Sequence, residues 1–172
     1  MNRHPGGLEH TKQMISLSGL LPPAKILDMG AGLGESAALL RSLGYEALGI
    51  DLNAEPQQPF MLKGDFLSSP FSDESFDGIL SQCAFYVSGQ SLHAFKTAYA
   101  LLKPGGILMI SDVCPRDTSL QTLAEISGFT VLHFEDQTSA WKEYYIEAIW
   151  RGTAECFPCS QKMNYEMLIC QK

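Results

Sequence analysis

A cluster of three glycines behind a short apolar segment constrains the fold of this chain more than any other feature. Residues 25–29 (KILDM) predict a strand, Gly30, Gly32 and Gly34 follow it, and the next residues, ESAALLRSL, predict a helix that ends at Gly44. Glycines let the backbone turn sharply and let a ligand approach to contact distance. A plain strand-to-helix turn needs only one glycine, so the pattern favours a nucleotide-like ligand at this loop.

The rest of the chain continues this alternation of strands and helices. Further strands are predicted at 45–51, 60–63, 76–81, 106–112, 129–136 and 163–170, and further helices at 8–20, 90–103, 119–127 and 139–150. Pro104-Gly105-Gly106 predicts a turn between a helix and the strand after it, and Thr118 with Gln121 predicts a capping box. The alternation indicates an α/β fold with a largely parallel sheet covered by helices.

The link between the second and third strands is unusually short. It consists of the eight residues LNAEPQQP (52–59), whose two prolines prevent a full helix. A parallel crossover normally takes a dozen or more residues. We nevertheless expect the pair to be parallel, with a loop in place of the usual helix.

Composition limits the class of protein. A length of 172 residues, with 45% hydrophobic and 18% charged residues, is typical of one globular domain. No stretch approaches the roughly 18 uncharged apolar residues of a membrane span, and the first residues lack the apolar core of a signal peptide, so we expect a cytoplasmic protein. A formal charge of -7 without a basic run argues against nucleic acid as a partner. The odd number of cysteines predicts thiols: Cys83, Cys114, Cys156, Cys159 and Cys170.

The spacing of the glycines discriminates between ligands. Gly30, Gly32 and Gly34 give G-x-G-x-G, and Glu35 stands where a dinucleotide fingerprint has its third glycine. A carboxylate at a helix N-terminus would repel a pyrophosphate. A ligand without phosphate therefore fits better, and an NAD(P)-dependent oxidoreductase is the weaker alternative.

Carboxylates follow the second and third predicted strands. Asp51 is placed to accept hydrogen bonds from vicinal ribose hydroxyls, although a turn cap before Asn53 is the alternative. Asp65 offers a carboxylate to an adenine amino group, and Phe66 offers a ring edge or backbone N–H to the base. A turn with a core phenylalanine would look the same.

These segments together resemble a known family. ILDMGAGLGES, GIDLN, KGDF, SFDGILSQCAFY and LLKPGGILMISD, in this order over residues 26–112, are similar to the class I S-adenosylmethionine-dependent methyltransferases of the type 11 methyltransferase-domain group. The resemblance implies a Rossmann-like, seven-stranded, mostly parallel sheet with helices on both faces and a C-terminal antiparallel hairpin. It also implies S-adenosyl-L-methionine as cofactor and methyl transfer as activity.

The resemblance assigns roles along one domain of residues 1–172. An N-terminal helix (1–23) and a helical insertion (137–162) flank a cofactor-binding core (24–136). The cofactor-binding residues implied are Asp28, Gly30, Ala31, Gly32, Gly34, Asp51, Leu52, Asp65 and Phe66, with Ser81 or Gln82 meeting the methionine end and the incoming acceptor. The missing helix in the 52–59 link is the departure from the family pattern.

Catalysis of methyl transfer depends mainly on positioning. Holding the nucleophile and the methyl group at attack distance can supply ~7–11 kcal/mol, and a base is needed only for a hydroxyl or ammonium acceptor. Tyr86 and Asp112 follow the fourth and fifth strands and are the candidates to orient or deprotonate an acceptor. A loop-packing tyrosine and a capping aspartate are the alternatives. Cys83 and Cys114 lie nearby and are interpreted as small buried hydrophobes.

Two features near the C-terminus remain open. The helix at 139–150 carries aromatic residues that either pack on the sheet or form a lid over an apolar acceptor, namely Trp141, Tyr144, Tyr145 and Trp150. Cys156 and Cys159 form a C-x-x-C pair without the partners of a zinc site, so no metal is predicted. We expect an enzyme acting on a small molecule or a small exposed group of a protein. A non-catalytic methyltransferase-like binding subunit is the alternative, and the acceptor and oligomeric state stay open.

Overall fold

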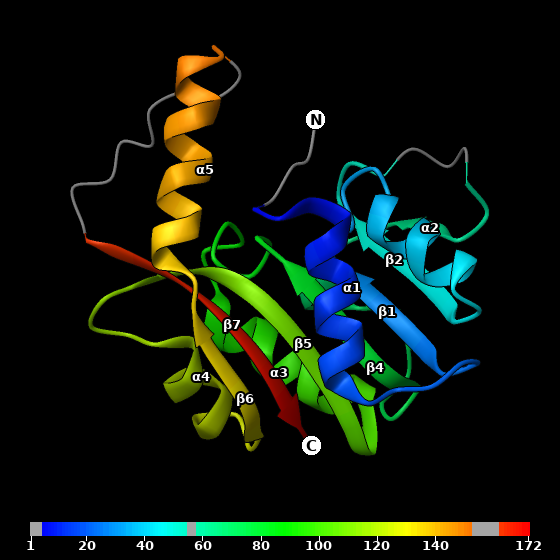
Figure 1. Cartoon of the computed structure of the whole chain (residues 1–172). Helices are drawn as coiled ribbons and strands as arrows, with labels where there is room; N and C mark the ends of the chain where they lie inside the picture. Colours follow the sequence, from blue (N-terminus) through cyan, green and yellow to red (C-terminus); the bar gives the residue numbers. More distant parts are fainter. Residues whose placement is uncertain (1–4, 55–57, 153–161) are drawn as a thin grey trace.

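A computed structural model describes residues 5–54, 58–152 and 162–172. Seven strands form one sheet in the order β3-β2-β1-β4-β5-β7-β6 (Figure 1). The strands are β1 (Lys25–Met29), β2 (Glu46–Asp51), β3 (Met61–Lys63), β4 (Phe76–Gln82), β5 (Leu102–Pro115), β6 (Thr130–Asp136) and β7 (Met163–Gln171). The helices are α1 (Gly7–Ser18), α2 (Glu35–Ser42), the 3-10 turn η1 (Phe66–Ser68), α3 (Ser91–Leu101), α4 (Leu120–Ile126) and α5 (Thr138–Trp150).

The sheet is parallel except at β7. Strands β1 to β5 pair in parallel, whereas β7 runs antiparallel to both β5 and β6. This confirms the predicted fold class and its C-terminal antiparallel hairpin. The pairing of Gly49 with Met61 and of Asp51 with Lys63 also confirms that β2 and β3 are parallel despite their short connection.

Helices cover both faces of the sheet. On one face, Met14 and Ile15 of α1 and Leu40 of α2 pack against the sheet, and on the other face α3, α4 and η1 enclose a larger cluster that includes Phe85 and Phe95. A strand buried on both faces needs an almost continuous apolar run, which explains the sequence of β1. The carboxyl ends of the parallel strands consequently form one open edge.

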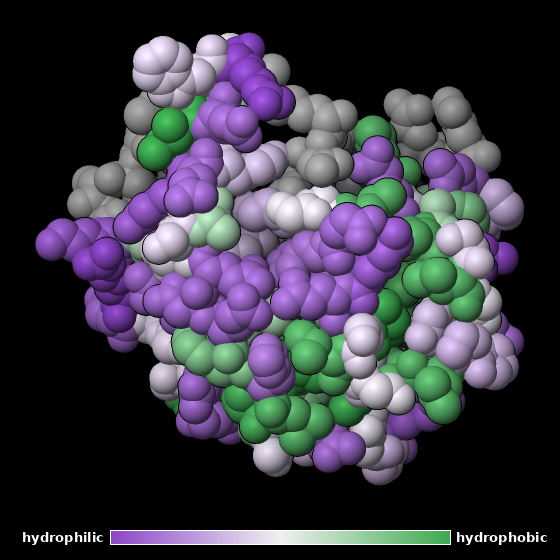
Figure 2. All heavy atoms as spheres, in the orientation of Figure 1, coloured by the Kyte–Doolittle hydropathy of each residue, from purple (hydrophilic) through white to green (hydrophobic). Residues whose placement is uncertain are grey.

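Two terminal helices lie near that edge. α5 follows β6, packs on β7 and projects beyond the end of the sheet (Figure 1). α1 lies across the front of the view, and its outer side carries the exposed Glu9, Lys12 and Gln13. Figure 2 shows a mainly hydrophilic band across the middle of this face, with apolar side chains gathered below it. No helix in the described ranges is long and apolar enough to cross a bilayer.

Two local predictions are wrong. The helix predicted over 90–103 ends at Leu101, because Leu102 already pairs with Phe76. β5 runs through the Pro104-Gly105-Gly106 segment, and its register against β4 shifts there, since the next pair is Gly78 with Ile107. The capping box between Thr118 and Gln121 does not form. Ser119 is the N-cap instead, since its hydroxyl accepts from the Gln121 N–H and donates to the Glu166 carboxylate at 2.8 Å. A tertiary contact from β7 thus selects the cap.

Candidate functional site

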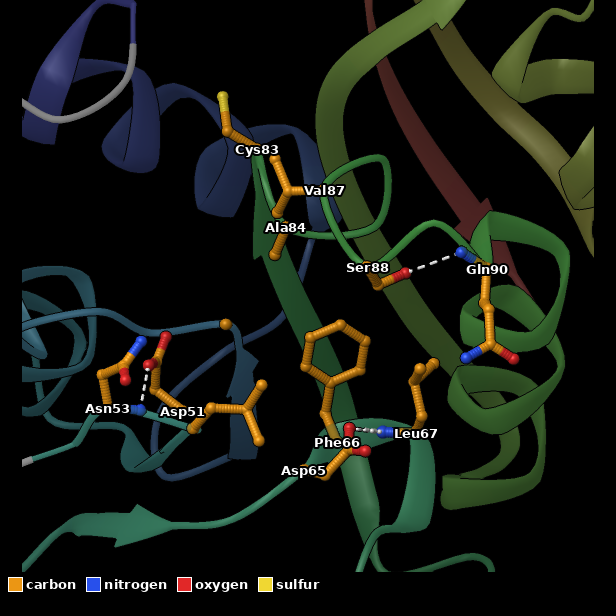
Figure 3. A pocket seen from close by; sticks show the side chains of 12 residues that line it. Asp51, Asn53, Asp65, Phe66, Leu67, Cys83, Ala84, Val87, Ser88 and Gln90 are labelled. Carbon is orange, nitrogen blue, oxygen red and sulfur yellow. Dashed lines mark hydrogen bonds between the residues drawn. The ribbon is translucent and has the colours of Figure 1, made fainter.

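Two adjoining hollows open at the carboxyl ends of β1, β2 and β4. The larger has a volume of about 420 Å³ and the smaller about 180 Å³. Both are lined by Gly30 and Cys83, where they adjoin, and the two hollows together are called the cleft below. Figure 3 shows the larger hollow, with side chains entering it from the end of β2, from η1 and from the loop after β4.

The glycine loop forms the floor where the two hollows meet. Gly30 has φ +80°, and a Cβ atom there would lie 2.2 Å from the Cβ of Ala84. The loop and the end of β4 can therefore approach each other only because residue 30 lacks a side chain. Ala31 and Gly32 line the smaller hollow. Gly34 is the N-cap of α2 and does not line either hollow.

Asp51 organises one side of the larger hollow. Its Oδ2 accepts a hydrogen bond from the Gly32 N–H at 2.9 Å, and its Oδ1 accepts one from the Asn53 N–H at 2.8 Å. A carboxylate offers about four lone-pair positions, so two remain for a ligand. Asp51 can fix the glycine loop and bind vicinal hydroxyls at the same time.

The opposite side of the larger hollow can hold a flat ring. Phe66 is buried and stacks on Phe85 with ring centroids 5.8 Å apart, while its ring faces the hollow in Figure 3. Asp65 Oδ1 accepts from the Leu67 N–H at 2.8 Å, which leaves its second oxygen for a donor such as an amino group. Leu52, which is 61% exposed, adds apolar surface to the same hollow.

Buried charge distinguishes the smaller hollow. Asp28 is only 4% exposed; burial and the charge of Asp51 raise its pKa to about 7, against the opposing effect of a hydrogen bond from the Ala37 backbone. Glu35, Ser36 and Gln82 line the same hollow. Ser81, by contrast, is fully buried and donates to the Met29 carbonyl at 3.0 Å, so it ties β4 to β1 and does not line the cleft.

Tyr86 and Asp112 come together beneath the loop after β4. Asp112 is 1% exposed, and its carboxylate accepts from the N–H groups of Tyr86 at 3.0 Å and Val113 at 2.7 Å. Burial raises the pKa of Asp112 to about 6, although these N–H donors and those of Phe85 and Ala84 lower it. The geometry fits a carboxylate that holds the loop. The Tyr86 side chain is half-buried in the aromatic cluster described next.

An aromatic cluster adjoins the cleft at Cys83. Trp141 stacks on Tyr165 with a 6.3 Å centroid distance and a 7° interplanar angle, and Tyr145 meets the indole edge-on at 5.3 Å. Cys83 Sγ lies 3.5 Å from the Tyr165 hydroxyl. Burial and the charge of Asp112 raise the pKa of Cys83 to about 12, so it is a neutral thiol at physiological pH.

The remaining candidates lie elsewhere. Trp150 is 87% exposed near the far end of α5, and Cys114 is buried in the core. Cys83, Cys114 and Cys170 are free thiols, whereas Cys156 and Cys159 fall outside the described residues. Within the described ranges, no group of three or more histidine, cysteine or acidic side chains is arranged to hold a metal ion.

Sequence reasoning located most of the cleft but missed several of its lining residues. Those missed are Ser36 in α2, Asn53 after β2, Leu67 in η1, and Ala84, Val87, Ser88 and Gln90 in the loop after β4. The sequence marks these residues only by their position, since they lie in the segments that follow the carboxyl ends of the strands, where a ligand is expected to bind.

Comparisons with known proteins agree with this geometry. Residues 27–110 match the family described as "Methyltransferase domain". Phosphoethanolamine N-methyltransferase 1 of Arabidopsis thaliana is 31% identical over 123 residues, which cover 63% of this chain and 25% of that protein. A Bacillus subtilis protein named "Uncharacterized methyltransferase YodH" is 27% identical over 155 residues, covering 78% of this chain and 64% of that one. The chain thus spans about a quarter of the plant protein and less than two thirds of the bacterial one.

A solved structure extends the comparison to the whole fold. Phosphoethanolamine N-methyltransferase 2 of Haemonchus contortus, in complex with S-adenosyl-L-methionine, has a TM-score of 0.78 against this chain at 18% identity. The match covers 98% of this chain and 53% of that one. At this identity the likeness establishes a shared fold.

Proposed function

We propose that this chain, whose residues 27–110 match a methyltransferase domain family, is a class I S-adenosylmethionine-dependent methyltransferase and binds S-adenosylmethionine in the cleft between Asp28 and Asp65. We further propose that it transfers the methyl group to a small molecule or to a small exposed group of a protein. When bound, the cofactor supplies a methyl group on a positively charged sulfonium, ready for in-line displacement.

The side chains of the cleft fit the parts of this cofactor. Asp51 would accept from the ribose hydroxyls with the lone pairs that Gly32 and Asn53 leave unused. Asp65 would accept from the adenine amino group, and Phe66 would pack against the base. Asp28 would face the ammonium of the methionyl part from the smaller hollow.

The observation that carries the proposal is the sign of the charge along the cleft. Carboxylates line both hollows, and no lysine or arginine among the described residues lines either one. A cofactor with a sulfonium and an ammonium is stabilised by this field, whereas a pyrophosphate is repelled. The cleft therefore favours S-adenosylmethionine over a dinucleotide.

The chain contributes to the reaction by holding the acceptor. Positioning can supply ~7–11 kcal/mol of the barrier without covalent catalysis. The Asp112 carboxylate fixes the loop backbone at Tyr86, so Asp112 acts as a positioning residue. The Tyr86 hydroxyl is the group that would orient an acceptor by hydrogen bonding. The neutral Cys83 thiol does not compete for the methyl group, because thiols react as thiolates.

The aromatic cluster is the proposed acceptor side. Cys83 lines the cofactor cleft and also packs with Tyr86, Trp141 and Tyr145. An acceptor that enters over these rings would reach the junction of the two hollows with little water beside it.

Calorimetry with three ligands tests the function. S-adenosylmethionine and S-adenosylhomocysteine should bind, and NAD should bind more weakly or not at all. Release of S-adenosylhomocysteine during incubation with panels of amines, thiols, hydroxyl compounds and phosphoethanolamine would then identify the acceptor class. Tighter binding of NAD would refute the proposal. Cofactor binding without turnover on any acceptor would favour the non-catalytic binding subunit.

A further inference from the structure

A methionine of β3 fills the space behind the glycine loop. The half-buried side chain of Met61 lies where two glycines of other elements have no side chain. A Cβ atom on Gly34 would lie 2.6 Å from the Met61 Sδ, and a Cβ atom on Gly49 would lie even closer to that sulfur and 2.8 Å from the Cβ of Ala31. The Met61 thioether therefore packs across Gly49 against the loop that connects β1 to α2.

The register of the sheet explains why this side chain meets the loop. Gly49 of β2 pairs with Asp28 of β1 on one side and with Met61 on the other. Residues in register on neighbouring strands point to the same face of a sheet. Met61 and Asp28 therefore lie on one face, and it is the face of α2, because the Asp28 carboxylate accepts a hydrogen bond from the Ala37 backbone.

This is also the face on which a further helix would be expected. The connections from β1 to β2 and from β2 to β3 step in the same direction along the sheet, so right-handed crossovers would lie on the same face. No helix occurs among the described residues of the 52–59 link. Met61 and the residue before it pack against α2 instead: Met61 meets Gly34 at the N-cap, and the Phe60 ring lies 5.2 Å from the guanidinium of Arg41 in the last turn.

This packing matters for a ligand because the supported loop lines the smaller hollow. Ala31 and Gly32 line that hollow directly. The Gly32 N–H is bonded to Asp51 at 2.9 Å, and the Gly34 N–H donates to the Ala31 carbonyl at 2.8 Å. Asp51 therefore fixes the loop from the side of the cleft, and Met61 packs against it from behind.

We propose that Met61 is a positioning residue of the cofactor site: its thioether supports the glycine loop in place of a crossover helix and holds it in the conformation that binds the cofactor. The inference rests on the proposed function. Met61 lines neither hollow, so it would act only through the loop. An unbranched thioether suits this role because it adapts to irregular space.

Truncation and a volume-preserving replacement test this role by calorimetry. Met61→Ala should weaken S-adenosylhomocysteine binding about 3- to 30-fold, the range for residues that act on a site without touching its ligand. Met61→Leu, of similar volume, should bind within about 2-fold of the wild type. Met61→Val keeps a strand-forming residue but removes the sulfur, so it should also weaken binding and serves if Met61→Ala does not fold.

Met109→Ala is the matched control. It removes the same side chain from β5, where Met109 is 1% exposed and packs in the cluster beneath α1, away from the glycine loop. This variant should lower the melting temperature at least as much as Met61→Ala, because it empties a fully buried position, and should leave the affinity for S-adenosylhomocysteine unchanged.

Hydrogen exchange in the ligand-free protein reports on the loop itself. The N–H groups of Gly32 and Gly34 are bonded in the wild type, so a loosened loop should expose them more often. In Met61→Ala they should exchange faster relative to the amides of β1, and in Met109→Ala this ratio should stay as in the wild type. An unchanged ratio in Met61→Ala would show that Met61 does not hold the loop.

A double variant tests the contact between Met61 and Gly49. Gly49→Ala adds a methyl group to the space that the Met61 Sδ and the Ala31 Cβ occupy, so it should displace the loop and weaken binding. In the Met61→Ala background the added methyl partly fills the vacated space. The double variant should therefore lose less affinity than the product of the two single losses, and a loss equal to that product would refute the contact.

The outcomes separate this inference from the proposed function. If the wild-type protein binds neither S-adenosylhomocysteine nor S-adenosylmethionine, the proposed function fails and this inference fails with it. If the wild type binds but Met61→Ala binds equally well, or Met109→Ala weakens binding as much as Met61→Ala does, Met61 is only a packing residue. The inference then fails while the proposed function stands.

Discussion

Replacing Asp28 with asparagine should stabilise the ligand-free protein while damaging the cofactor site. The carboxyl group is almost fully buried at the end of β1, and its pKa of about 7 stands well above the usual 3.8 because of burial and the charge of Asp51. Asparagine has nearly the same shape, can still accept the N–H of Ala37 through its side-chain oxygen, and carries no charge at any pH.

The magnitude follows from proton linkage. A carboxyl group whose folded-state pKa is raised contributes stability that is fully present below the unfolded pKa near 4 and is lost as pH rises towards 7. Raising the Asp28 pKa from 3.8 to about 7 corresponds to roughly 4 kcal/mol at 1.36 kcal/mol per pH unit. Asp28→Asn should therefore be more stable than the wild type at pH 8, by up to about 4 kcal/mol, and should match it near pH 4.

Urea unfolding between pH 4 and 8 measures this difference, with Asp77→Asn as a control of opposite sign. Burial raises the pKa of Asp77, but hydrogen bonds from Lys103 and the Lys25 N–H outweigh it and lower the pKa. Asp77→Asn should thus lose stability at pH 8. Equal stabilities of Asp28→Asn and wild type across this pH range would refute the reasoning.

The same substitution should weaken S-adenosylhomocysteine binding, because the ligand's ammonium loses its counter-charge. In the wild type at pH 7, where Asp28 is about half protonated, binding of an ammonium should release about half a proton. Calorimetry in two buffers of different ionisation enthalpy detects that proton. Asp28→Asn should release none, and an unchanged proton count in the variant would exclude Asp28 as the source.

Three further predictions concern the two sides of the cleft. Asp51→Ala should weaken cofactor binding by ~1.5–3 kcal/mol in calorimetry, the range for hydrogen bonds to a charged group. Gly32→Val should abolish binding while leaving the far-UV circular dichroism largely intact, because Gly32 lines the smaller hollow and a side chain there would occupy the ligand's space; the φ of +55° also disfavours valine. Undiminished affinity would show that the loop is merely a turn. Tyr86→Phe should lower kcat/KM without changing cofactor affinity or greatly lowering the melting temperature. Trp141→Ala should lower kcat/KM without changing cofactor affinity but should also lower the melting temperature, because the indole is buried and stacks on Tyr165. Trp150→Ala, on the same helix as Trp141 but 87% exposed, should be silent. Unfolding of Trp141→Ala together with a silent Tyr86→Phe would assign these aromatics to the core.

The sequence predicted the fold well because its signals are local. Apolar runs bounded by glycine and proline located every strand, and the pairing of β2 with β3 followed from the expected sheet despite the short link. The two errors have tertiary causes. The Leu102 pairing shortened α3, and the Glu166 carboxylate from a strand more than forty residues away selected Ser119 as the cap, at 2.8 Å. No sequence pattern around Ser119 indicates that Glu166 lies beside it in the folded chain.

The site was predicted in outline for a related reason. Residues directly after strands must meet at the carboxyl edge of a parallel sheet, so Asp51 and Asp65 were recognisable from position. Burial, however, depends on what packs from elsewhere. The interior position of Ser81 and the contact from Thr11 to Gln82 arise only when distant elements are assembled, and neither has a signature within its own segment.

The buried and strand-end aspartates show that two roles, capping a loop and binding a ligand, do not exclude one another. Asp28 accepts from the N–H of Ala37, Asp51 from that of Gly32, and Asp112, which lies inside β5, from that of Tyr86, so each carboxylate holds backbone outside its own strand. A carboxylate has about four acceptor positions, and one or two such bonds leave the others for a ligand. Capping therefore orders the loop first and presents the remaining lone pairs in a fixed direction. Removing such a carboxylate deletes a ligand contact and loosens a loop together, which is why the charge-neutral, shape-preserving asparagine at Asp28 is more informative than alanine.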